Sequence, residues 1–163
     1  MRLTFVALSL AFLLSVLTPA QEPGTRLPTV TMAPVSKVQL RAGGSATVEL
    51  DFRVGSEFHV NSNKPHSALL IPTALHLTAV EPLKMVAVNY PAGQDMSFPF
   101  APTEKLSVYS GDFTITAVVK ASAKAASGTY PVSGELRFQA CDRSACYPPR
   151  SIPVKFEVNV LNR

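Results

Sequence analysis

Apolar and polar residues alternate through Ser45-Ala46-Thr47-Val48-Glu49-Leu50-Asp51-Phe52-Arg53-Val54, and this stretch decides the fold. A period of two places every second side chain on one face of a β-strand, here Ala46, Val48, Leu50, Phe52 and Val54. The same alternation returns at 73–80, 113–119, 130–140 and 152–160, with glycine-bearing turns between the runs. Short alternating strands separated by turns are typical of two packed antiparallel sheets. The sequence therefore predicts an all-β fold, an antiparallel β-sandwich.

The N-terminus has the pattern of an export signal. A positive start, Met1-Arg2, precedes a mostly apolar run at 3–17, and small residues follow up to Ala20. No later segment approaches the ~20 apolar residues that a membrane-spanning helix needs, so we expect no span in the mature chain. An uncleaved anchor helix is the alternative. The expected organisation is a signal peptide at 1–20, a flexible leader at 21–34 and one β-sandwich domain at 35–163, exported and soluble.

Size and composition limit the classes of function. Cleavage would leave about 143 residues, enough for one domain with a hydrophobic core. The formal net charge of +4 loses one unit with Arg2, and the other Lys and Arg residues form no basic run, so nothing indicates nucleic-acid binding. Two cysteines allow at most one disulfide, so apolar burial must supply most of the stability. We expect a monomer without a cofactor or a bound metal.

The segment at 91–105 differs from its surroundings because it combines prolines with large apolar side chains. Three prolines make it a poor sheet strand, whereas Phe98 and Phe100 are residues that normally avoid water. Two interpretations stay open. The segment is either a long loop that covers a site as a lid, or a loop whose aromatic side chains fill one end of the core.

The two cysteines, Cys141 and Cys146, are five positions apart and border two predicted strands. A disulfide that closes so short a loop is worth only about 2 kcal/mol by the loop-entropy estimate, which is weak for a structural cross-link. Such a pair can open and close without dismantling the fold, as a redox carrier requires. Pro148 and Pro149 prevent a helix from starting at Cys146, so the thiols lack the helix N-terminus that acidifies a thioredoxin-type cysteine. We therefore expect exchange only with a dedicated partner.

The cysteine segment also resembles a known family. Gln139-Ala140-Cys141, four further residues and Cys146-Tyr147-Pro148-Pro149 are similar to the N-terminal periplasmic domain of the thiol:disulfide interchange protein DsbD. The segments at 57–65, 70–73 and 104–111 agree with that family's pattern in order and spacing. The likeness covers roughly residues 35–160, and the cysteine motif with its trailing Tyr-Pro-Pro is its most specific part.

This resemblance implies an immunoglobulin-like sandwich whose paired cysteines lie on adjacent strands beneath a lid loop. It implies that Cys146 forms the mixed disulfide with partner proteins and that Cys141 resolves it. Phe98 or Phe100 would be the aromatic side chain of the lid, and the choice between them is open.

Three further residues are candidates that border the site, namely His59, Asn61 and Tyr147. An ordinary outward-facing polar pair is the alternative for His59 and Asn61, which share one face of their strand.

The family also implies a role and partners. Its domain receives electrons from a thioredoxin-like domain and passes them to periplasmic disulfide isomerases and to thioredoxin-like proteins of cytochrome c maturation. The chain would then be a thiol–disulfide oxidoreductase component that works only with partner proteins. DsbD continues into membrane and thioredoxin-like domains, whereas this sequence stops at Arg163, so we expect a separate electron donor. The direction of electron flow stays open.

Three rival functions are weaker. An immunoglobulin-like binding module with a structural disulfide would hold a pair that mild reductants do not open. A metal-binding sandwich has candidate ligands in His59, His66 and His76, but none has ligand spacing to the cysteines. A hydrolase lacks any nucleophile-elbow or paired-acid motif.

Overall fold

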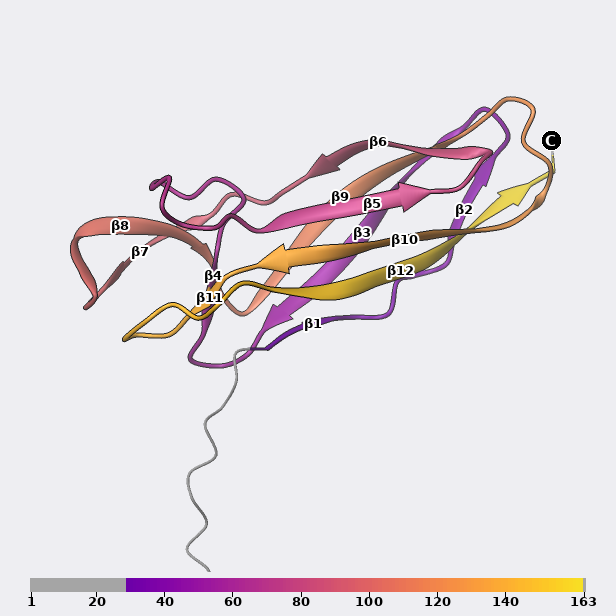
Figure 1. The fold of residues 1–163 in the computed structure, drawn as a ribbon. Helices are drawn as coiled ribbons and strands as arrows, with labels where there is room; N and C mark the ends of the chain where they lie inside the picture. Colours follow the sequence, from indigo (N-terminus) through magenta and orange to yellow (C-terminus); the bar gives the residue numbers. More distant parts are fainter. Residues whose placement is uncertain (1–28, 163) are drawn as a thin grey trace, which may run out of the picture.

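The computed structural model describes residues 29–162, and the regular secondary structure within this range consists of β-strands alone. Within that range no helix has the length and apolar character needed to cross a bilayer. The predicted signal peptide and the leader up to residue 28 lie outside the described residues. Figure 1 shows two long sheets facing each other, with a small third sheet at the end of the molecule opposite the C-terminus.

Each of the three sheets has four strands. The first has the order β1-β3-β9-β6, formed by Val30–Met32, Ser45–Val54, Asp112–Ala121 and Leu83–Asn89. The second has the order β2-β12-β10-β5, formed by Val38–Arg41, Arg150–Leu161, Gly128–Phe138 and Ala74–Ala79. The third has the order β11-β4-β8-β7, formed by Ala140–Cys141, His59–Asn61, Ala101–Tyr109 and Gln94–Phe98. Pairing is antiparallel throughout except between β2 and β12, which run parallel.

The hydrophobic core lies between the two long sheets. Along β3 the alternating residues Val48, Leu50, Phe52 and Val54 are buried, as the period of two predicts, and Ala46 at the strand's beginning is half-buried. They form one cluster with alternate residues of the facing strands, including Leu136, Val154 and Val158. Each of the five predicted alternating segments lies in a strand over most of its length. The immunoglobulin-like antiparallel β-sandwich is confirmed.

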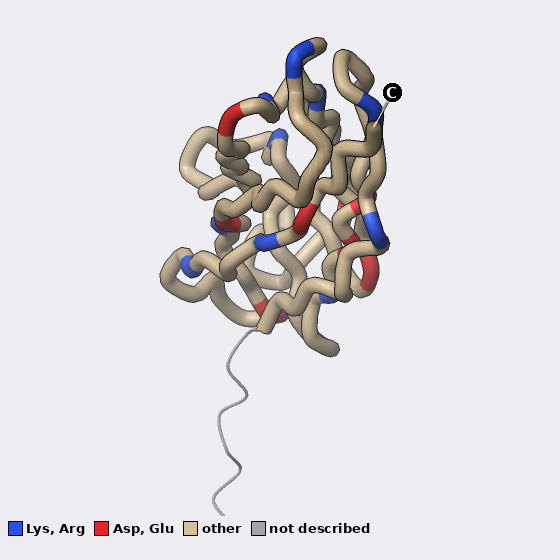
Figure 2. The backbone as a smooth tube through the Cα atoms, turned by 90° about the vertical axis from the view of Figure 1, so that its right-hand side faces the viewer, with Lys and Arg blue, Asp and Glu red and all other residues tan. Residues whose placement is uncertain are grey.

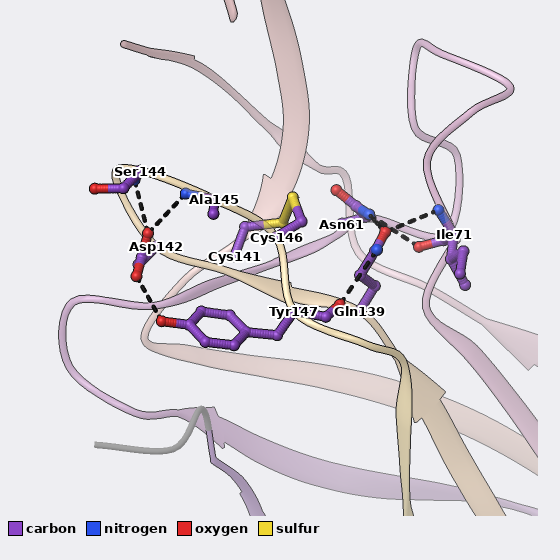
Figure 3. Close-up of a disulfide and its surroundings, with 9 residues drawn as sticks. All are labelled: Asn61, Ile71, Gln139, Cys141, Asp142, Ser144, Ala145, Cys146 and Tyr147. Atoms are coloured by element: carbon purple, nitrogen blue, oxygen red, sulfur yellow. Dashed lines mark hydrogen bonds between the residues drawn. A yellow bond between two sulfur atoms is a disulfide. The ribbon is translucent and has the colours of Figure 1, made fainter. Parts of the chain in front are cut away.

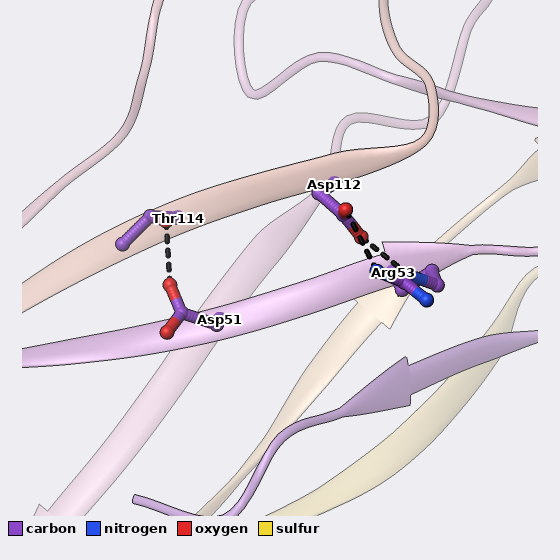
Figure 4. Close-up of polar contacts among 4 residues, drawn as sticks. All are labelled: Asp51, Arg53, Asp112 and Thr114. Carbon is purple, nitrogen blue, oxygen red and sulfur yellow. Dashed lines mark hydrogen bonds and ion pairs between the residues drawn. The ribbon is translucent and has the colours of Figure 1, made fainter. Parts of the chain in front are cut away.

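The outer face of the first sheet is polar. Arg53 on β3 and Asp112 on β9 are register partners whose side chains form an exposed ion pair, and Asp51 accepts a hydrogen bond of 2.6 Å from Thr114. Figure 4 shows both contacts along this face. Elsewhere, Lys and Arg are interspersed with Asp and Glu, as Figure 2 shows for the described chain. The polar half of the alternation therefore faces water on β3 and β9, and the apolar half faces the core.

Two predictions about loops are wrong. The segment at 91–105 is not a long loop, because β7 and β8 form a hairpin with Phe98 paired to Ala101 across the turn. Four of the five β7 residues are exposed, so the strand has no alternating pattern to detect. The flexible leader assigned to 21–34 also extends too far, since Val30–Met32 form β1 and pair with β3. Val30 is buried, and a three-residue strand is too short to show a period.

Candidate functional site

Cys141 and Cys146 form a disulfide with a Cα–Cα distance of 3.9 Å. Cys141 ends β11, the two-residue strand at the edge of the third sheet, and pairs with Cys146 as an isolated antiparallel bridge. The two half-cystines differ in burial, because Cys141 is 0% exposed whereas Cys146 is exposed. Of the two half-cystines, Cys146 is therefore the one that solvent reaches.

Asp142 organises the loop between the cysteines. Its Oδ1 accepts hydrogen bonds from the backbone N–H groups of Ser144 and Ala145, at 2.7 and 2.9 Å, and its Oδ2 accepts one of 2.7 Å from the Tyr147 hydroxyl. Figure 3 shows these three contacts around one carboxylate. The Tyr147 hydrogen bond, followed by those from the backbone, holds the pKa of Asp142 below its usual value. The same hydrogen bond raises the pKa of Tyr147, because deprotonation would remove the donor. The loop is therefore stabilised by hydrogen bonds to one of its own side chains.

A second group of hydrogen bonds ties this loop to β4. Asn61 donates through Nδ2 to the Ile71 carbonyl at 3.0 Å and to Gln139 Oε1 at 3.1 Å. Gln139 in turn donates through Nε2 to the Tyr147 carbonyl at 3.3 Å. Figure 3 shows this chain of amides beside the disulfide. The residues before and after the cysteine pair are therefore connected through side chains.

His59 is the cross-strand neighbour of Cys141, since the two residues are register partners of β4 and β11. Its side chain is buried, at 3% exposure, and its ring stacks on Phe98 with a centroid distance of 3.9 Å. Burial lowers the pKa of His59 to about 4, and the negative charge of Asp142 opposes this only in part. The imidazole is therefore neutral at physiological pH. Asn61 is fully buried, so the outward-facing alternative for the pair is wrong.

The β7–β8 hairpin brings its aromatic residues to the site through His59. Phe98 is buried at 7% exposure between His59 and Phe100, and Phe100 stacks on it at 5.5 Å while remaining 37% exposed. A separate aromatic pair is formed by Tyr147, which packs edge-on against Phe58 with a centroid distance of 5.9 Å. Phe98 is thus the inner aromatic residue of the hairpin and Phe100 the outer one.

The structure brings the predicted site residues into one region at the third sheet. Two organising residues carried no role in the sequence analysis, Asp142 and Gln139. The sequence offers one signal for Asp142, because an Asp at the start of a tight loop commonly accepts hydrogen bonds from the backbone N–H groups that follow it. The Gln139 contacts depend on tertiary packing. Arg143, which lies in the loop between the cysteines, is exposed.

The three histidines do not form a cluster. His66 pairs with Asp95 at 2.7 Å, and His76 is exposed on β5 opposite Glu135. Among residues 29–162 no group of three or more His, Cys, Asp or Glu side chains is placed to hold a metal ion.

Comparisons with known proteins show similarity in fold. No protein-family model and no curated protein matches the chain. A type I cohesin of ScaB from Pseudobacteroides cellulosolvens superposes with a TM-score of 0.52 at 14% identity, over 82% of this chain and 93% of the cohesin. This match shows a shared β-sandwich fold.

The DsbD-like structures match with lower scores. The reduced N-terminal domain of DsbD from Neisseria meningitidis gives a TM-score of 0.44 at 17% identity, over 72% of this chain and 82% of that one. The N-terminal periplasmic domain of ScsB from Proteus mirabilis gives 0.46 at 12% identity, over 86% of this chain and 49% of that one. Similarities of this size do not carry function, which has to be argued from the residues.

Proposed function

We propose that the chain is a periplasmic thiol–disulfide exchange protein that relays electrons through Cys141 and Cys146. The observation that carries this proposal is the unequal burial of the pair, with Cys146 exposed and Cys141 fully buried next to it. Exchange needs one sulfur that a partner can reach and a second that can complete the reaction. A disulfide that serves only as a cross-link needs neither feature. The cysteine motif shared with the DsbD N-terminal domain gives independent support.

When the chain accepts electrons, the exchange takes place in two thiolate attacks. A partner thiolate attacks Cys146 Sγ, the Cys141–Cys146 bond breaks, and Cys141 leaves as a thiolate that takes up a proton. A second thiolate of the partner then attacks the mixed disulfide, which releases reduced Cys146 and an oxidised partner. In the opposite direction Cys146 attacks a partner disulfide, and Cys141 resolves the mixed disulfide.

The surroundings of the pair are suited to partner-dependent exchange. The hairpin aromatic Phe98 covers His59, the neighbour of Cys141, so access from that side is restricted. Thioredoxin-like periplasmic proteins are the partners that we infer from the resemblance, as donor and as acceptor. Their potentials set the direction of flow.

The first test is the reduction potential of the pair, measured by equilibration in thiol buffers followed by alkylation and mass analysis. A reversible couple between about −180 and −270 mV, the range of exchange proteins, is expected. A pair that stays oxidised below about −300 mV would instead indicate a structural disulfide in a binding module.

A second test separates the roles of the two cysteines. Cys141→Ala leaves the exposed thiol, which should form a mixed disulfide with oxidised glutathione. Cys146→Ala leaves only the buried thiol and should react far more slowly under the same conditions. Equal rates for the two variants would contradict the assignment.

A further inference from the structure

Among the described residues, two buried side-chain polar atoms have no hydrogen-bond partner, and both belong to β4. They are His59 Nε2 and Asn61 Oδ1, on side chains that are 3% and 0% exposed. A buried polar atom without a hydrogen-bond partner costs free energy, and such atoms are rare in folded proteins. Their position on the strand beside the disulfide calls for an explanation.

The strand pairing places Cys141 next to His59. Cys141 and His59 are directly paired across β11 and β4, so their side chains lie on the same face of the third sheet. Their sequence neighbours Ala140 and Val60 point to the opposite face and join the main core. A cystine sulfur carries no hydrogen, whereas a cysteine thiol is a donor, although a weak one.

The ring of His59 is fixed in orientation and can accept a hydrogen bond. Stacking on Phe98 holds its plane, and its low pKa keeps it neutral, so one ring nitrogen carries a lone pair. Asn61 is held differently, because its Nδ2 already donates to Ile71 and Gln139.

We propose that His59 Nε2 accepts the thiol hydrogen of Cys141 in the reduced protein, and that this contact favours the dithiol state. The inference rests on the proposed function, because it concerns the same pair. Reduction by a partner dithiol breaks the S–S bond, brings in two electrons and two protons and leaves the partner as a disulfide. Each sulfur of the pair takes up one of the two protons that the partner dithiol gives up. The Cys141 thiol formed in this way then donates a hydrogen bond to His59 Nε2.

A variant at this position has opposite effects on the two redox states. His59→Phe keeps an aromatic ring against Phe98 and removes the unpaired acceptor, so the oxidised protein should be as stable as the wild type or more stable. The reduced protein loses its thiol acceptor. The equilibrium constant for reduction by glutathione should therefore fall by roughly two- to tenfold, where tenfold corresponds to about 30 mV. A purely structural role of His59 would change stability without changing the potential.

The experiment compares the reduction potentials of wild type, His59→Phe and the matched control His76→Phe, which changes an exposed histidine of β5. Imidazole nitrogen chemical shifts are recorded by NMR in the oxidised wild type and after full reduction with a phosphine. We expect a more negative potential for His59→Phe alone, and a reduction-dependent shift of His59 Nε2 that His76 does not show. An unchanged potential together with an unchanged shift overturns the inference.

The outcomes also separate this inference from the proposed function. A wild-type potential in the exchange range, with no effect of His59→Phe on it and no reduction-dependent shift of His59 Nε2, would refute the His59 contact and leave the relay intact. A wild-type potential far below that range would refute the relay. The nitrogen shift after phosphine reduction would then still decide whether His59 accepts the Cys141 hydrogen.

Discussion

The two long sheets and the small third sheet bury their side chains in different ways. In β3 of the first sheet, buried and exposed residues alternate, and the buried ones in the core are apolar. In β4 of the third sheet three consecutive residues are buried, with Val60 in the main core and His59 and Asn61 on the other face. One strand is therefore covered on both faces, and its second face is polar. The comparison separates a region that supplies most of the hydrophobic core from a region that contains the candidate site.

Truncating a core side chain should lower stability strongly without changing the reduction potential of the disulfide. Leu50→Ala removes a fully buried side chain of β3 and should lower the free energy of unfolding by about 2–5 kcal/mol. Chemical denaturation measures this change, and Arg53→Ala on the exposed face of the same strand is the matched control, with no measurable loss expected. The reduction potential of the folded variant should stay at the wild-type value. A large change in potential would show that the two regions are coupled.

Reducing the disulfide should lower the free energy of unfolding by less than truncating a core side chain does. The cross-link closes a short loop, so full reduction of the wild type should lower the free energy of unfolding by about 2 kcal/mol. Denaturation with and without reductant gives the difference, with the Cys141→Ala, Cys146→Ala double variant as a control that should not respond to reductant. Unfolding of the whole sandwich on reduction would mean that the fold depends on the pair.

The aromatic residues of the hairpin should affect the rate at which the disulfide is reduced. Phe98→Ala uncovers His59 and should speed reduction of the disulfide by dithiothreitol on the order of tenfold, equivalent to ~1.4 kcal/mol off the barrier. Stopped-flow reduction kinetics measure this effect. Phe100→Ala, which removes the more exposed outer ring, should have a smaller effect. The reverse order would identify Phe100 as the shielding residue.

The smallest effect is expected within the cysteine loop. Tyr147→Phe removes the main hydrogen bond that lowers the pKa of Asp142, so this pKa should rise toward its ordinary value. Because the folded-state pKa is depressed, the contribution of Asp142 to stability is present above its unfolded pKa and is lost as pH falls through the folded pKa. In the variant, the contribution of Asp142 to stability should be lost over a narrower pH range, between the same unfolded pKa and a folded pKa that is less depressed. A carboxyl carbon NMR titration tests this, and an unchanged pKa would contradict it.

The site was predictable in its parts but not in its arrangement. Spacing and composition indicated the pairing of Cys141 with Cys146, and the resemblance pointed to His59, Asn61, Phe98, Phe100 and Tyr147. The hairpin at 94–109 was missed because β7 is almost fully exposed and its prolines argued for a loop. The short strand at 30–32 was missed because its stability comes from pairing with β3 rather than from its own pattern.

The sequence by itself determined the long strands of the sandwich, because alternation of apolar and polar residues is a local property that only a half-buried strand satisfies. It also determined that the single disulfide closes a short loop. Only the tertiary structure decided that Cys141 is buried while Cys146 is exposed, that Phe98 lies inside Phe100, and that a neutral His59 faces Cys141. These features depend on contacts between segments far apart in the chain, and no local pattern encodes them.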